Sequence, residues 1–195
     1  MYLACTIIAL QWSCSKEEML LESDLFGLSE SQLYYWSSNE KHSLQIDQNR
    51  LIIRSSLSEQ ETEKQLADVL GANLSVSVLP TGWIIVGKST RFSQHEVEKI
   101  KEISNLLELA PSFTFDGSYA IPTGEIVVKL KSGNNIDDIL RNYEGRVSFV
   151  EENMRGVYIL KVNRMTELLP IANSIFESGA VEWCHPDFMA KFELY

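Results

Sequence analysis

The sequence predicts an α+β fold of two tandem ferredoxin-like (βαββαβ) units, each an antiparallel sheet with its helices on one face. Strand and helix patterns follow the order β-α-β-β-α-β from residue 49, and the same order runs again from about residue 120. Two segments also match at a fixed distance: Gly82–Val86 corresponds to Gly156–Leu160, and Pro111–Phe113 corresponds to Pro186–Phe188. The offset of 74 to 75 residues at both points indicates a tandem duplication.

The first unit is predicted over residues 49–115. Each of its two helices opens with a capping box, in which Ser58 pairs with Glu61 and Ser93 with Glu96. The second helix carries an apolar stripe of Val97, Ile100, Ser104 and Leu107. The strands are predicted, in order, over residues 51–54, 75–79, 83–86 and 112–115.

The second unit is predicted over residues 116–189. Its first three strands are expected at 124–130, 147–150 and 157–160, and its helices at 136–143 and 166–178. In the last strand, Val181 and Trp183 alternate with Glu182 and Cys184, which is typical of a half-buried strand. Pro186 lacks a backbone donor, so this strand leaves the sheet there or continues only as an edge.

An aromatic hairpin is predicted ahead of the two units, over residues 32–48, with the run Tyr34-Tyr35-Trp36 in its first strand. These rings could form a carbohydrate platform, but a strand that faces the core and covers a sheet edge is the favoured interpretation. Residues 17–31 are acidic with scattered apolar side chains and are predicted to be a linker or a frayed helix.

The composition argues against a nucleic-acid partner. The chain has 17 Lys and Arg against 27 Asp and Glu, for a net charge of −10, and its bases are scattered singly among acids. Binding to phosphates requires clustered basic side chains, so no nucleic-acid role is expected.

The first residues resemble an export signal. Residues 1–16 contain a short apolar run followed by Ser13-Cys14-Ser15, which resembles a lipoprotein signal with Cys14 as the lipidated residue. The run is too short to span a bilayer, so a membrane contact is expected only through this segment or a lipid anchor. The chain is accordingly predicted to be exported, to the periplasm, cell surface or medium; a buried N-terminal strand is the alternative.

Enzymatic motifs are missing from the sequence. There is no G-x-S-x-G elbow, no phosphate-binding Gly loop and no H-E-x-x-H, and none of the three histidines precedes Gly-Thr. Cys184 and His185 are neighbours, but adjacent strand residues point to opposite faces and cannot form a nucleophile–base pair. The carboxylate pairs 137–138 and 151–152 show no converging ligands. No catalysis, no cofactor and no metal site are predicted.

The run Val181-Glu182-Trp183-Cys184-His185-Pro186-Asp187-Phe188 after a helix and Gly179 resembles the end of the N-terminal prodomain of bacterial secreted subtilases, of the fervidolysin type. The segments TGEIVVKLK and GVYILKV resemble the first and third strands of that family. The resemblance is stronger in the second unit than in the first. It implies a ferredoxin-like fold without the Asp, His and Ser motifs of the protease itself.

The resemblance also implies a function as intramolecular chaperone and inhibitor of a subtilisin-like catalytic domain. The sheet would pack on the protease, and the tail, residues 190–195, would lie in its substrate cleft. In that tail Phe192, Glu193, Leu194 and Tyr195 would contact the protease, with Tyr195 and Phe192 in two apolar pockets. The tail could equally be part of a linker, with the protease lost to truncation or encoded separately. The alternative function is an exported two-repeat protein-binding module of a surface lipoprotein.

Overall fold

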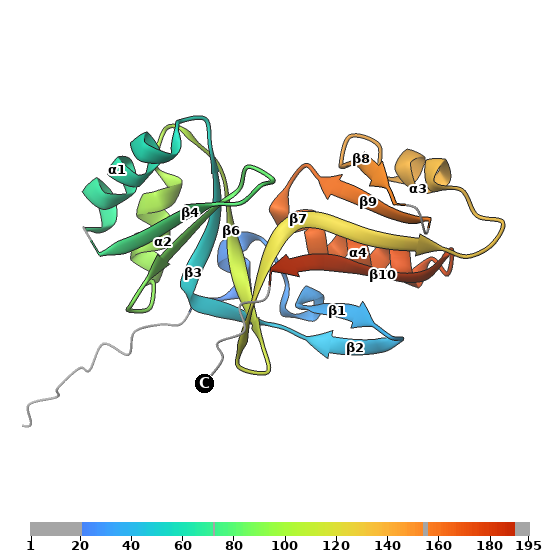
Figure 1. Cartoon of the computed structure of the whole chain (residues 1–195). Helices are drawn as coiled ribbons and strands as arrows, with labels where there is room; N and C mark the ends of the chain where they lie inside the picture. The colour runs from blue at the N-terminus through green and yellow to red at the C-terminus, as the bar shows by residue number, and fades with distance from the viewer. Residues whose placement is uncertain (1–20, 72, 154–155, 190–195) are drawn as a thin grey trace, which may run out of the picture.

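The computed structural model describes residues 21–71, 73–153 and 156–189 (Figure 1). The first unit has the predicted order of elements and the ferredoxin-like strand order β4-β5-β3-β6. Its elements are β3 (Gln45–Ser55), α1 (Glu59–Leu70), β4 (Leu74–Val78), β5 (Ile84–Lys88), α2 (Gln94–Lys101) and β6 (Leu106–Phe115).

The second unit repeats this arrangement with the strand order β8-β9-β7-β10. Its elements are β7 (Ser118–Leu130), α3 (Ile136–Asn142), β8 (Val147–Glu152), β9 (Val157–Val162), the 3-10 helix η3 (Met165–Glu167), α4 (Leu168–Glu177) and β10 (Val181–Met189). In both units the first strand lies between the third and the fourth, and every pair is antiparallel. The predicted fold class is therefore confirmed.

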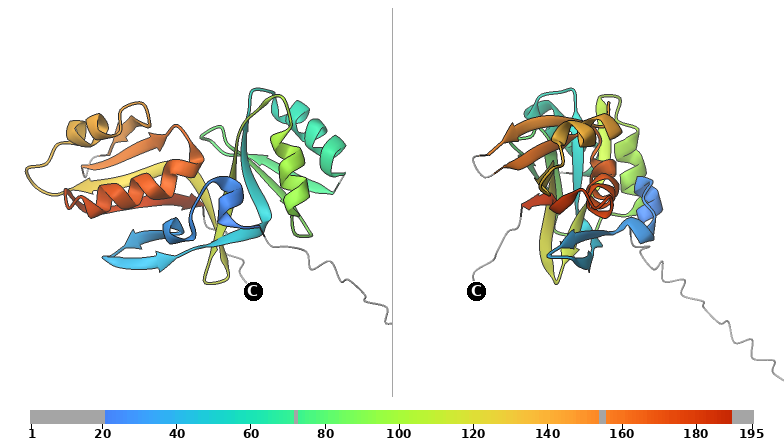
Figure 2. Two further views of the ribbon diagram at one scale, coloured as in Figure 1. Left: turned by 180° about the vertical axis from the view of Figure 1, so that it is seen from behind. Right: turned by 90° about the vertical axis from the view of Figure 1, so that its right-hand side faces the viewer.

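A hairpin joins the two sheets into one. β6 pairs with the start of β7 from Phe113↔Ala120 to Phe115↔Ser118, which produces an eight-stranded sheet. Further along, β7 leaves β6 and pairs with β9, from Glu125↔Lys161 to Lys129↔Val157. Seen from behind, α2 and α4 both lie in front of their sheets, so the helices of the two units cover the same side (Figure 2).

The helix starts follow the predicted capping boxes. Ser58 accepts from the backbone N–H of Glu61, and Ser93 accepts from that of Glu96, while each Glu accepts from its Ser in return. The predicted extent of the second helix is wrong. α2 ends at Lys101, and Leu107 lies in β6 with 59% of its surface exposed. The pairing of β6 with β3 begins at Leu106. Leu107 therefore belongs to the sheet, although its helical spacing alone would place it on the apolar stripe of α2.

Two apolar clusters form the core. The cluster on the helix side of the first sheet contains Leu51, Ile53, Leu66, Val97 and Ile100. The other cluster is the core of the second unit, and it also includes Ile52, Ile85 and Ala110, which point to the opposite face of the first sheet. The second unit therefore covers the face of the first sheet that α1 and α2 do not cover.

The aromatic hairpin is formed by β1 (Tyr34–Ser37) and β2 (Glu40–Ser43) and lies beside β10 and α4 without joining the large sheet (Figure 1). The prediction of a linker or frayed helix over 17–31 is wrong from residue 21 onward, because this segment is packed against the first unit. Two 3-10 helices, Ser23–Phe26 and Glu30–Gln32, follow there, and Leu21, Phe26 and Leu28 are buried among the core side chains of the first unit. The spacing of these three buried residues fits neither a helical nor a strand period, so periodicity in the sequence could not identify them.

Candidate protein-docking face of the second unit

Two predicted functional segments lie outside the described residues: Cys14 in the signal-like segment, and the tail residues Phe192, Glu193, Leu194 and Tyr195. The place where the tail begins is described. β10 ends at Met189, which is paired with Ile121 of β7. The tail therefore starts at the end of an edge strand, and its contacts stay a prediction.

Each of the three histidines lies on a different element of the described structure. His42, His95 and His185 lie on β2, α2 and β10. Cys184 points into the core, where only 2% of it is exposed and its Sγ lies 3.4 Å from the carbonyl oxygen of Ala172. His185 lies on the opposite face of β10, as the alternation of strand side chains predicts. Burial raises the pKa of the Cys184 thiol, which disfavours the reactive thiolate.

No group of three or more metal-ligating side chains occurs among the described residues. Within the same ranges, no helix is long and apolar enough to cross a membrane.

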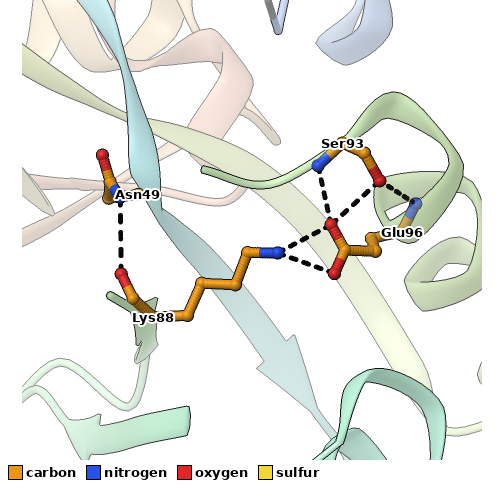
Figure 3. Close-up of polar contacts among 4 residues, drawn as sticks. All are labelled: Asn49, Lys88, Ser93 and Glu96. Atoms are coloured by element: carbon orange, nitrogen blue, oxygen red, sulfur yellow. Dashed lines mark hydrogen bonds and ion pairs between the residues drawn. The ribbon is translucent and has the colours of Figure 1, made fainter. Parts of the chain in front are cut away.

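A Lys–Glu pair at the start of α2 has a structural role (Figure 3). Lys88 Nζ lies 2.6 and 2.7 Å from the two carboxylate oxygens of Glu96, and the backbone N–H of Ser93 donates to the same carboxylate at 2.7 Å. Burial alone would raise the pKa of Glu96, but these hydrogen bonds outweigh it and the pKa is lowered. Lys88 is thus held by the capping box and joins β5 to α2.

The face of the second sheet that points away from α3 and α4 forms an open surface, which we call the open face. Its central row runs across four strands through Glu151, Ile159, Val127 and His185. Neighbouring rows contain Val157, Lys129 and Trp183 on one side, and Lys161 and Glu125 on the other. Apart from exposed Glu151, these side chains are half-buried.

The open face combines an apolar centre with charges at its rim. Among the rim residues, Thr123 donates to Asp187 Oδ2 at 2.9 Å, and Lys161 Nζ donates to the carbonyl oxygen of Thr81 at 2.9 Å. Burial raises the pKa of Glu125, and the nearby Asp187 carboxylate raises it further. A surface with an apolar centre and a polar rim has the composition of a protein–protein interface.

The first unit has no equivalent surface, because the second unit packs on it. Trp83 lies at this junction and is 1% exposed. Thr81 Oγ1 donates to the carbonyl oxygen of Thr123 at 2.7 Å, and Glu108 accepts from the backbone N–H of Thr166 at 3.3 Å. Within the described part of the chain, the second sheet therefore leaves one face uncovered, whereas the first sheet does not.

The position of Trp183 differs from the prediction. The pairing of β10 with β7 shifts register between Val181 and Trp183, so the strict alternation expected from the sequence breaks there. Val181 and Cys184 are buried as a result, and Trp183 lies on the open face with its ring stacked 5.5 Å from that of His185. Pro186 stays in β10, which pairs with β7 alone, so the predicted edge position is confirmed.

No protein-family model matches the chain, and no curated protein matches it. Among solved structures, the small subunit of acetolactate synthase from Thermotoga maritima is similar at 14% identity, over 76% of this chain and 100% of that one, with a TM-score of 0.27. That likeness is too distant to carry an argument about function. A functional argument therefore has to rest on the geometry of the open face.

Proposed function

We propose that the chain is a non-catalytic protein that docks the open face of its second unit onto a folded partner. The observation that carries this proposal is the difference between the two sheets. The first sheet is covered on both faces, whereas Val127, Ile159 and Trp183 line a face that no described element covers. Removing such half-buried apolar side chains from water against a partner contributes favourable free energy to binding.

We further propose that the partner is the catalytic domain of a subtilisin-like serine peptidase, which this chain would help to fold and then inhibit. Two features support this identity. The run Val181–Phe188, which carries the resemblance to subtilase prodomains, forms the edge strand of the docking unit. The tail that follows this strand in the sequence carries Phe192 and Tyr195, which would enter the substrate cleft of the peptidase as part of an extended segment.

The proposed order of events follows from contact order. A protease dominated by non-local contacts folds slowly, and a partner surface that is already folded lowers the barrier to assembling them. Export is part of the same proposal, because a secreted peptidase would need its prodomain on the same side of the membrane.

The decisive experiment begins with the DNA that follows codon 195, which should encode a subtilase catalytic domain in frame or nearby. Biolayer interferometry with that purified catalytic domain then measures binding. Removal of residues 192–195 should weaken binding by about two orders of magnitude or more, because two aromatic side chains contribute roughly 2 kcal/mol each when buried.

A second arm separates the face from the tail. Val127→Asp places a charge at the centre of the open face and should weaken binding at least about tenfold. The matched control is Ser77→Asp, which adds the same charge at an exposed strand position of the first unit and should bind normally. Equal binding by all four proteins would refute the docking face, and absence of any subtilase partner would leave a docking module for a different protein.

A further inference from the structure

A groove lies between the aromatic hairpin and β10, beside the open face. It encloses about 350 Å³ and is lined by Trp36 and residues 37–39 of the hairpin, Phe176 of α4, and Glu182, Trp183 and His185 of β10. The hairpin touches β10 near the other end of that strand, where the rings of Tyr35 and Phe188 are 5.4 Å apart. The groove is thus a gap between the hairpin and β10, next to the contact between Tyr35 and Phe188.

The aromatic walls of the groove are held in place before any ligand arrives. The ring of Trp36 stacks on that of Phe176 at 5.0 Å and 21°, and the ring of Trp183 stacks on that of His185 at 5.5 Å and 16°. Trp36 Nε1 also donates to Glu177 Oε1 at 3.0 Å, which fixes the indole at its edge. Rings that are already ordered lose little conformational entropy when a ligand binds.

The chemistry of the lining favours a cation. Indole rings attract ammonium and guanidinium groups through their negative faces, and the attraction strengthens when water is excluded. Glu182 adds an exposed carboxylate at the rim, and Glu177 adds a second one behind Trp36. The same hairpin already holds a cation, since Lys41 Nζ lies 3.6 Å from the ring centre of Tyr34.

The backbone beside the groove favours an extended ligand. β10 pairs with β7 on one side, and the hairpin forms a separate sheet, so the other edge of β10 has no paired strand among the described elements. In an antiparallel ladder, alternate residues of an edge strand point their N–H and C=O groups away from the sheet. Residues 182–185 therefore offer backbone groups to a short extended segment next to the aromatic rings.

We propose that this groove binds an Arg or Lys side chain of an extended peptide segment from another protein, with the peptide backbone along β10. The cation lies between Trp36 and Trp183, and Glu182 balances its charge. The groove shares Trp183 and His185 with the open face, but it also uses the hairpin and the unpaired edge of β10, and it would bind peptides whether or not the partner of the open face is a peptidase.

Blocked pentapeptide pools test the proposal on the full chain. Each pool has one fixed central residue, Arg, Lys, Gln or Glu, flanked by equimolar Ser, Thr, Val and Tyr, and retention on the immobilised protein is measured by mass spectrometry. The Arg and Lys pools should be retained at least about tenfold more than the Gln pool, as expected for one cation between aromatic rings. Equal retention of the Arg, Lys and Gln pools would overturn the proposal.

Two variants locate the site, and a third variant serves as the control. Trp36→Leu and Glu182→Gln should each reduce the preference for Arg over Gln by about threefold or more. Glu63→Gln makes the same change of charge on the exposed surface of α1 and should leave the preference unchanged. Glu182 is exposed, so its variant keeps the test valid even if Trp36→Leu destabilises the hairpin. A preference that survives Glu182→Gln and Trp36→Leu would place the binding elsewhere and overturn the assignment.

A competition arm tests the backbone contact. N-acetyl-arginine amide carries the same guanidinium without an extended chain. It should compete at least about tenfold less well than the Arg pentapeptide pool, because it lacks the bonds along β10. Equal competition would refute a peptide ligand and indicate a site for small cations.

Discussion

Gly124→Ala should strongly destabilise the protein, because this residue combines two constraints at the junction of the units. Its φ of +86° lies in the left-handed region, where an alanine costs about 1–2 kcal/mol. A Cβ at this position would also lie 2.7 Å from Trp83 Nε1 and 3.2 Å from its Cδ1. Trp83 is 1% exposed and lies under the guanidinium of Arg54, 4.8 Å from its ring centre, so the indole cannot move freely.

The expected loss is the sum of backbone strain and overpacking. Overpacking of a filled core costs about 1–3 kcal/mol, so Gly124→Ala should lower the free energy of unfolding by about 2–5 kcal/mol. Urea denaturation followed by far-UV circular dichroism measures this quantity, provided that the slope with urea concentration stays constant.

Gly117→Ala is the matched control for the backbone. Gly117 has a φ of +76° in the turn between β6 and β7, and no atom lies within 4 Å of its added Cβ. This variant should lose only about 1–2 kcal/mol. If both variants lose the same free energy, the contact with Trp83 contributes nothing and the account of the junction is wrong.

Three further predictions follow from the described contacts. Glu96→Gln should cost about 1 kcal/mol at pH 7; because the folded pKa of Glu96 is lowered, the difference from wild type should vanish as pH falls below that folded pKa, and a difference that persists in acid would contradict the ion pair with Lys88. In a chain whose two N-terminal cysteines are replaced by Ser, Cys184 should react with a thiol reagent only after unfolding, and rapid reaction of the native protein would contradict its burial. Val127→Thr, a change of similar volume on the open face, should alter the free energy of unfolding by less than about 1 kcal/mol in urea titrations, and a larger loss would mean that this face is covered in the free protein.

Much of the fold could be predicted because its local signals agree with the sheet. Both capping boxes and the order of the eight strands in the two units follow from spacing and turn residues. What failed depends on long-range pairing. The register shift that places Trp183 on the open face cannot be recognised from the alternation of apolar residues. Leu107 lies in the sheet, although its spacing in the sequence also fits a helical stripe.

The candidate site was predictable only in part. The edge position of β10 follows from Pro186, since a residue without an N–H cannot serve a central strand. The difference between the two sheets could not be predicted, because units with the same pattern of strands give no indication of which one covers the other. Trp83 carried a usable signal: the corresponding position of the second unit is Val157, and an indole there indicates a contact that the second unit lacks.

The shared core has a consequence for the independence of the halves. If the chain were cut in the turn between β6 and β7, the separated first half would expose Ile52, Ile85, Ala110 and Trp83 to water as one apolar patch. The second half would lose fewer large side chains from its core, since its own helix α4 still covers the inner face of its sheet. The dependence is therefore one-sided: the first half needs its neighbour in order to stay soluble, and selection can change the second half only in ways that preserve the surface that covers the first sheet.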